Sequence, residues 1–200
     1  MKIILFCCLA LISLGPDSLG QSHKKEIIKF QRELNKEFND PKESPLPEED
    51  LKKFSGHPFY PIDEKFRIEA KFTRIENPVS FQMQTTTDRL PVYDIYGQAT
   101  FQLEGKTYIL NIYQSHRLRE KKEYKDYLFL PFTDLTNGEE TYGGGRYIDL
   151  AIPPDNIIVV DFNKAYNPYC AYNYKYSCPI PPKENNIDTA ITAGVKNLKL

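Results

Sequence analysis

From residue 66 onward, hydrophobic side chains recur at every second position in short segments, and this period of two constrains the fold more than any other feature. Residues 66–73 alternate Phe, Ile, Ala and Phe with Arg, Glu, Lys and Thr, a pattern typical of a strand with one buried and one exposed face. Residues 79–84 repeat it. Residues 99–103 and 108–113 flank Glu104-Gly105, which predicts a β-hairpin with a short glycine turn.

Three further candidate strands follow, at residues 127–132, 147–152 and 157–162. Turn-forming residues separate these segments, and no helical pattern lies between them. A series of short strands without intervening helices favours antiparallel pairing over a βαβ arrangement. We therefore expect a mainly β protein, built as an antiparallel β-sandwich or a partly closed β-barrel.

Two helices are expected before the strands. Residues 22–39 carry Ile27, Phe30, Leu34 and Phe38 on one stripe, as in an amphipathic helix. Asp40-Pro41 ends it. The helix is expected to dock onto the β domain, and a membrane or partner surface is the alternative use of its apolar face. Residues 45–54 predict a short second helix, with acidic residues in its first turn.

The first twenty residues have the pattern of a secretory signal peptide. Lys2 precedes an apolar run at residues 3–14, and small residues precede a cleavage site near Gly20-Gln21. A buried N-terminal helix is the alternative. The run is shorter than the ~20 residues a membrane span needs, and no later stretch is long enough. The expected organisation is a signal peptide at 1–20, a helical segment at 21–55 and a β-rich domain at 56–200, in a protein exported to the periplasm or secreted.

The balance of charged residues limits the kinds of partner that the chain is expected to bind. The chain has 26 Lys and Arg against 27 Asp and Glu, a net charge of −1. Nucleic-acid binding depends on clustered cations that neutralise phosphates, so no nucleic-acid partner is expected. The sequence does not identify whether a cofactor is bound, or which one.

The segment at residues 132–147 departs from the strand pattern. Three consecutive glycines end at Gly145 and precede Arg146. Glycines let backbone N–H groups approach a bound group, and a guanidinium suits a carboxylate or phosphate. One interpretation of the segment is therefore an anion-binding loop. The alternative is a structural hairpin connection in which Arg146 pairs with Asp134 or Asp161.

The segment at residues 161–186 is polar, aromatic and rich in proline. It contains Cys170 and Cys178, the two cysteines that remain after removal of the leader. A cysteine pair in an exported chain predicts a disulfide. Reduced structural thiols, a metal site and a catalytic thiol are the alternatives, and no metal site is predicted because neither His57 nor His116 has ligand spacing to the cysteines.

The runs PFTDLTNGEETYGGGRYIDL (131–150) and DFNKAYNPYCAYNYKYSCPIPPKEN (161–185) resemble the domain of unknown function 1684 family, and HPFYPIDEKFRIEAKF (57–72) fits it too. The resemblance implies no activity. Two positions, Glu139 and Tyr169, depart from its pattern. That pattern singles out Asp134, Gly138, Thr141, Tyr142, Gly143, Gly145, Arg146, Tyr147, Asp161, Asn163, Tyr166, Asn167, Pro168, Cys170, Tyr172, Cys178, Glu184 and Asn185.

Familiar catalytic motifs such as G-x-S-x-G, H-E-x-x-H and C-x-x-C are missing. The favoured hypothesis is therefore binding of a small anionic or polar ligand. A hydrolase or lyase with Asp161 or Glu184 as base and Arg146 as electrostatic stabiliser is the second, and a structural or interaction domain is the third. The expected ligand-binding residues are Asp134, Tyr142, Gly143, Gly145, Arg146, Tyr147, Asp161, Asn163, Tyr166, Asn167 and Glu184.

Overall fold

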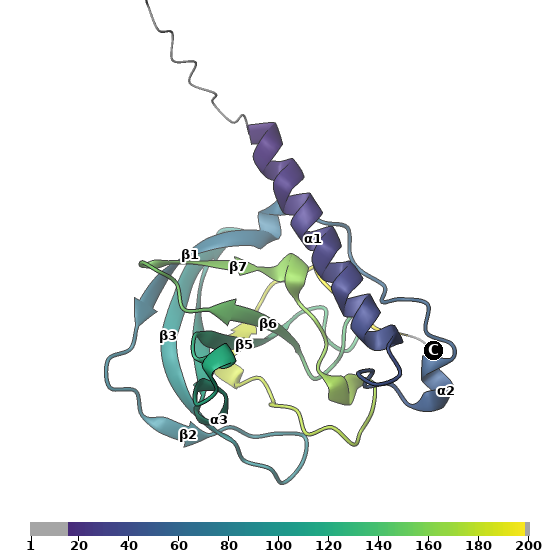
Figure 1. The fold of residues 1–200 in the computed structure, drawn as a ribbon. Helices are drawn as coiled ribbons and strands as arrows, with labels where there is room; N and C mark the ends of the chain where they lie inside the picture. The colour runs from purple at the N-terminus through teal and green to yellow at the C-terminus, as the bar shows by residue number, and fades with distance from the viewer. Residues whose placement is uncertain (1–15, 199–200) are drawn as a thin grey trace, which may run out of the picture.

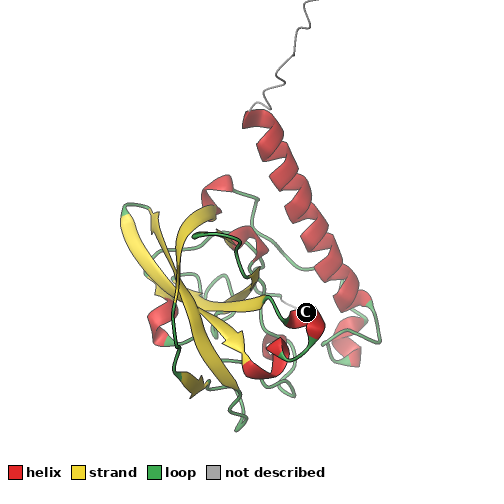
Figure 2. Ribbon diagram, turned by 60° about the vertical axis from the view of Figure 1, so that its left-hand side comes forward, coloured by secondary structure: helices red, strands yellow, loops and turns green. Residues whose placement is uncertain are grey.

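The computed structural model describes residues 16–198. Its fold is mainly antiparallel β, a sheet curled into a half-barrel with a long helix lying along one side (Figures 1 and 2). The main path of the sheet runs β6-β5-β4-β3-β1-β7, while β2 pairs with β3 and β8 with β5. The β5–β8 pairing is parallel and the others are antiparallel. The predicted partly closed barrel is thus confirmed.

The helices and strands follow the expected order, except that a four-residue helix (His116–Arg119) lies between two of the strands, where no helix was expected. The helices are α1 (Pro16–Asn39), α2 (Glu48–Leu51) and α3 (His116–Arg119), and 3-10 turns lie at 64–66, 122–124, 162–164, 169–171 and 183–185. The strands are β1 (Arg67–Arg74), β2 (Ser80–Gln82), β3 (Val92–Leu103), β4 (Lys106–Ser115), β5 (Tyr127–Asp134), β6 (Arg146–Ala151), β7 (Ile157–Asp161) and β8 (Asn186–Ile187). The second helix is shorter than predicted, because it begins only after Pro47 and ends before Lys52.

The β3–β4 hairpin confirms the predicted turn. Leu103 faces Lys106 in the register, and both turn residues have positive φ, 50° at Glu104 and 77° at Gly105. Two consecutive positive φ angles match the right-handed twist of the flanking strands. This hairpin forms the centre of the sheet.

The two faces of the curled sheet carry different side chains. One face holds the main apolar core, which includes Leu110, Leu128 and Phe132. The opposite side carries an aromatic cluster around Tyr93, Phe129 and Tyr147. Because successive side chains of a strand point to opposite faces, β5 and β6 contribute to both.

Helix α1 lies beside the two end strands of the main path, β6 and β7. His23 near its start is hydrogen-bonded to Asp161 at the end of β7, with 2.7 Å between Nε2 and Oδ2. Ile27 is fully buried and Phe38 is 1% exposed. The predicted docking of the apolar stripe onto the β domain is therefore confirmed.

The predicted signal peptide lies largely outside the described residues. Helix α1 begins at Pro16, a residue suited to a first helical turn, and continues through the expected cleavage site near Gly20-Gln21. Among residues 16–198, no helix combines the length and apolar character needed to cross a membrane.

Candidate functional site

A cavity of about 540 Å³ lies between α1 and the aromatic side of the sheet. We call it the tyrosine pocket. Its walls come from α1, β3, β5, β6 and the segment at 166–179. Six tyrosines line it, namely Tyr93, Tyr127, Tyr147, Tyr166, Tyr169 and Tyr176. A concave, largely aromatic site with a few polar groups is the usual form of a small-molecule site.

Strand alternation places the two side chains of β6 that face this pocket. Tyr147 and Asp149 point into the pocket. Arg146, which precedes them, and Ile148, which lies between them, point to the other face of the sheet. Asp149 pairs with Phe129 of β5, which also lines the pocket. The backbone of Tyr147 exchanges two hydrogen bonds with that of Tyr166, at 2.9 and 3.0 Å. This bridge brings the 166–179 segment against β6.

Asp149 is the polar centre of the tyrosine pocket. The hydroxyls of Tyr127 and Tyr166 each donate to its Oδ1 at 2.7 Å. Asp149 is exposed to solvent on the open side of the pocket. The protein around it still displaces water and raises its pKa, while the two hydroxyls oppose that effect. Burial also raises the pKa of Tyr127 and Tyr166, which keeps both hydroxyls protonated as donors. A carboxyl with a shifted pKa in a cleft marks a candidate functional residue.

Helix α1 supplies the opposite wall. Phe30 and Leu34 of its apolar stripe are only half-buried and face the cavity, together with Glu33 and Glu37. The hydroxyl of Tyr169 donates to Glu37. Among the described residues, no Lys, Arg or His side chain lines the tyrosine pocket. The site is therefore aromatic and acidic.

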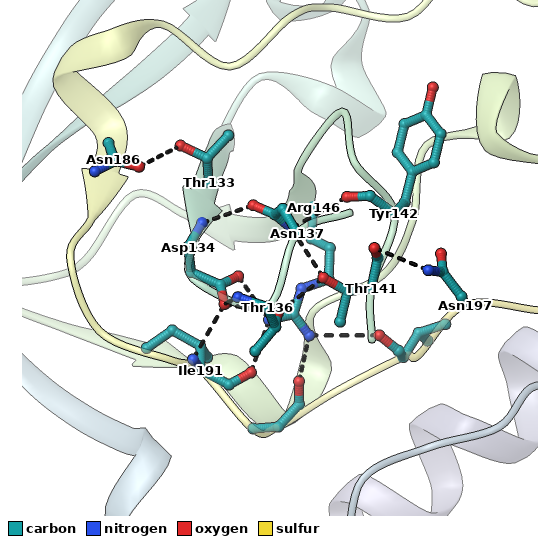
Figure 3. A network of polar contacts seen from close by, with 12 residues as sticks. Thr133, Asp134, Thr136, Asn137, Thr141, Tyr142, Arg146, Asn186, Ile191 and Asn197 are labelled. Carbon is teal, nitrogen blue, oxygen red and sulfur yellow. Dashed lines mark hydrogen bonds and ion pairs between the residues drawn. The ribbon is translucent and has the colours of Figure 1, made fainter. Parts of the chain in front are cut away.

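Arg146 lies elsewhere, in a closed network on the other side of β6 (Figure 3). The side chains of Arg146 and Asp134 are fully buried and form an ion pair of 2.9 Å. Arg146 also donates to the carbonyls of Ile191 at 2.8 Å and Ala193 at 2.5 Å. The Oδ1 of Asp134 accepts from both the backbone and hydroxyl of Thr136. These donors and acceptors are taken up by the protein, so the geometry matches the structural alternative at this loop.

The glycines beside Arg146 serve the same network. Gly145 has a φ of 87°, and a Cβ there would lie 2.6 Å from the carbonyl oxygen of Phe132. Only glycine fits without a shift of backbone. Thr136 and Thr141 hydrogen-bond at 2.8 Å inside the turn. Gly143 is exposed at its tip, and no anion-binding geometry is visible at Arg146.

The remaining predicted residues are dispersed, and most of them tie segments together. Asp161 pairs with His23 and also accepts from the backbone of Asn163. Asn163 exchanges two hydrogen bonds with the backbone of Asp63, at 3.0 and 2.9 Å. Asn167 donates to the carbonyl of Lys196 at 3.2 Å. Tyr142 lies near Cys170, and Glu184 is exposed on a 3-10 turn. Of the predicted set, only Tyr147 and Tyr166 line the tyrosine pocket.

The two cysteines lie close together, and both are free thiols in the structure. The predicted disulfide is therefore not confirmed. The backbone N–H of Cys170 donates to the sulfur of Cys178 at 3.1 Å. A hydrogen bond from the Cys178 thiol, opposed by partial burial, lowers the pKa of Cys170 to about 6. The pair is bound by hydrogen bonds instead of a covalent bond, and Cys178 lines the tyrosine pocket.

A cluster of Ser80, Asp94 and His116 lies on a different surface, but its geometry is not that of a catalytic triad. The Nε2 of His116 faces both the Asp94 Oδ1 at 2.8 Å and the Ser80 hydroxyl at 3.3 Å. A triad uses the two ring nitrogens for the two partners. Burial raises the pKa of Asp94, but hydrogen bonds from Ser80, His116 and Arg119 outweigh it and lower the pKa to about 2. The cluster therefore stabilises the ionised form of Asp94.

The sequence reasoning missed Asp149, the acidic residues of α1 and four of the six tyrosines. One signal could have identified Asp149. It stands two residues after Tyr147 in a strand, so the two must share a face. Such a pair places an aromatic ring and a carboxylate on one face of the strand. An amphipathic helix that packs against that face would leave a pocket with aromatic and acidic walls.

The comparisons with known proteins agree with this architecture. A model of the protein family of unknown function DUF1684 matches residues 52–196. The chain belongs to this family. The resemblance drawn from the two motif segments is thereby confirmed, and Arg146, Tyr147, Asp149 and the 166–179 segment all fall within the DUF1684 match.

A solved structure extends the likeness beyond the DUF1684 match. The solution NMR structure of an uncharacterized protein from Haloarcula marismortui is 32% identical, with a TM-score of 0.71. The alignment covers 90% of this chain and 97% of that one. No curated protein matches. The relatives therefore give the family and the fold and assign no activity.

Proposed function

We propose that the protein binds a small polar ligand in the tyrosine pocket, with Asp149 as the polar anchor. The observation that carries this proposal is a carboxyl group with a raised pKa at the centre of a 540 Å³ aromatic cavity. A carboxyl whose pKa is raised by its surroundings gains a favourable partner when a ligand that donates hydrogen bonds to it occupies the cavity. The buried ion pair of Arg146 and Asp134 lies on the other face of β6 and stabilises the strand that contributes Tyr147 and Asp149 to the pocket.

This proposal moves the site away from the expected glycine loop. The anionic ligand expected there loses its basis because Nη1 and Nη2 of Arg146 donate to protein carbonyls and to Asp134, and its Nε, which has no partner among the described residues, is buried. The hydrolase or lyase alternative loses its electrostatic stabiliser for the same reason. A second candidate function is acid–base catalysis by Asp149, favoured by its raised pKa. Conversion of the bound ligand by the wild type but not by Asp149→Asn would distinguish that activity from binding alone.

Native mass spectrometry of protein purified from its natural source tests the binding proposal. We expect extra mass in the native spectrum that disappears on denaturation. Glu33 is exposed at the pocket and pairs only with Lys29, itself exposed, so Glu33→Trp places a bulky ring at the cavity without disturbing the core. Arg32→Trp puts the same ring on an exposed position of α1 outside the pocket lining.

The expected result is loss of the extra mass in Glu33→Trp and its retention in Arg32→Trp. Both variants should unfold within about 0.5 kcal/mol of the wild type, as exposed substitutions usually do. Retention of the same mass in Glu33→Trp would place the ligand outside the tyrosine pocket and contradict the proposal.

We infer that the protein is exported and that its cysteine pair becomes oxidised there. The leader pattern at residues 1–20 and the proximity of Cys170 to Cys178 support this inference. Cleavage near Gly20-Gln21 would leave His23 on the mature chain to hold α1 against Asp161. Oxidation would form a bond between the two sulfurs and transfer two electrons and two protons from the thiols to the disulfide of an oxidising partner in the compartment. That disulfide would be reduced to two thiols. In the chain-entropy model, closing so short a loop stabilises the fold by ~2.5 kcal/mol.

The intact mass of the native protein tests both parts of this inference. We expect a chain that begins at Gln21 and is lighter than the fully reduced form by two hydrogen atoms, with no thiol available to an alkylating reagent. A chain that begins at Met1, or one that takes up two alkyl groups without prior reduction, would contradict it.

A further inference from the structure

We propose that the ligand of the tyrosine pocket is an organic cation, a primary or substituted ammonium compound carrying an apolar group. This inference rests on the proposed binding function and specifies its ligand class. Three carboxylates border the cavity, Asp149 from the sheet and Glu33 and Glu37 from α1. No described Lys, Arg or His side chain borders it. A cation would therefore meet negative charge on both walls, where, within the described part of the chain, Glu33 alone of the three carboxylates is paired with a cationic side chain, the exposed Lys29.

The aromatic walls support the same ligand class. The faces of tyrosine and phenylalanine rings carry negative electrostatic potential and attract cations within ~6 Å of the ring centre. Tyr127 and Tyr166 are held by their hydroxyls on Asp149, and Tyr169 is held by its hydroxyl on Glu37. These hydrogen bonds fix the rings around the carboxylates. The resulting cage combines aromatic ring faces with acidic side chains.

Asp149 has an oxygen available for the cation. Both tyrosine hydroxyls donate to Oδ1, and no hydrogen bond from the described residues reaches Oδ2. The side chain keeps a solvent-exposed surface because it borders the open cavity. An ammonium group placed at Oδ2 would form a charge-assisted hydrogen bond without displacing either tyrosine.

The cavity volume fits a ligand with more than a charged group. At about 540 Å³ it falls within the range of drug-sized sites. Phe30 and Leu34 of α1 supply apolar surface across the cavity from Asp149. The site therefore suits an amine with an aromatic or branched aliphatic group, in which the apolar part packs against α1 and the ammonium faces Asp149.

Three soluble probes that differ mainly in charge test this inference: 2-phenylethylammonium, 2-phenylethanol and 3-phenylpropanoate. Each is titrated to millimolar concentration into the protein, and the tyrosine ring signals are followed by NMR. We expect the ammonium compound to bind roughly tenfold or more tightly than the alcohol, from the ion pair and the cation–π contacts together. The carboxylate is expected to leave the pocket tyrosines unshifted.

Two variants assign the preference to the pocket. Asp149→Asn keeps an oxygen that can accept from both tyrosines and removes the charge, so the ammonium compound should bind about as weakly as the alcohol. Asp126→Asn neutralises an exposed carboxylate outside the pocket lining and should keep the preference. An Asp149→Asn protein whose unfolding midpoint equals or exceeds that of the wild type shows that the loss of binding is not a loss of fold.

The outcomes separate this inference from the proposed function. If the alcohol binds as tightly as the ammonium compound and Glu33→Trp abolishes both, the pocket is a binding site but not one for cations. If the carboxylate binds most tightly, the inference is overturned in the same way. If no probe shifts the pocket tyrosines and the native mass is that of the bare chain, the proposed function falls with it.

Discussion

Arg146→Ala is expected to lower the free energy of unfolding by about 3–5 kcal/mol, as removal of one partner from a buried ion pair usually does. The substitution leaves Asp134 charged in a fully buried position. It also removes the donors that hold the carbonyls of Ile191 and Ala193. The C-terminal segment would lose its attachment to β6. Chemical denaturation followed by circular dichroism measures the change.

Two further variants make this result specific. Arg117→Ala removes an exposed arginine on α3 and should change stability by no more than about 0.5 kcal/mol. Arg146→Lys keeps the charge but replaces the planar set of donors by a single ammonium, so its stability should lie between those of the wild type and Arg146→Ala. A loss below about 1 kcal/mol in Arg146→Ala would show that the network does not hold the fold.

The second large effect is a loss of stability in mild acid that depends on His57. This side chain is 7% exposed and lies among Phe38, Phe54 and Tyr172, whose ring centres are 4.3, 5.1 and 5.6 Å away. Burial lowers the pKa of His57 to about 4. Its Nδ1 is bonded to the side-chain oxygen of Asn35 at 2.8 Å, which anchors α1 to the segment before β1.

The direction of the pH effect follows from proton binding. In the unfolded chain His57 takes up a proton below its usual pKa near 6.5, while in the folded protein it stays neutral down to about 4. The unfolded state therefore binds more protons in this window, and stability falls as the pH falls. A shift of this size is worth about 3 kcal/mol between pH 6.5 and 4.

Unfolding free energies measured at several pH values test this expectation. His57→Asn keeps a polar group near the Nδ1 position without a titrating ring, so its stability should fall less between pH 6.5 and 4 than that of the wild type. The difference between the two slopes isolates His57 from carboxyl groups such as Asp149, which act in the opposite direction because of a raised pKa. Parallel slopes for the two proteins would contradict the account.

The fold was more predictable from the sequence than the site, for a physical reason. Period-two alternation reports which face of a strand is buried, so β1, β4 and β5 could be placed to within about two residues, whereas β3 begins at Val92, well before the predicted segment at 99–103. The pairing of β5 with the two-residue strand β8 could not be predicted, because so short a segment carries no period.

The site depends on contacts between distant segments, which no local pattern records. Asp149 receives hydrogen bonds from residues 22 and 17 positions away, and Tyr169 reaches Glu37 across 132 positions. The glycine loop and Arg146 could be recognised from the sequence as an unusual segment. Their local pattern fits an ion pair with the protein and one with a ligand equally well, and only the burial of Arg146 distinguishes the two.

A crystal structure of the protein purified with its natural ligand tests the central claim most directly. The account predicts ordered non-protein density between α1 and the sheet, with a ligand atom within hydrogen-bonding distance of the Asp149 Oδ2 and apolar atoms against Phe30 and Leu34. Density for the ligand at another surface, with only water in the tyrosine pocket, would contradict it.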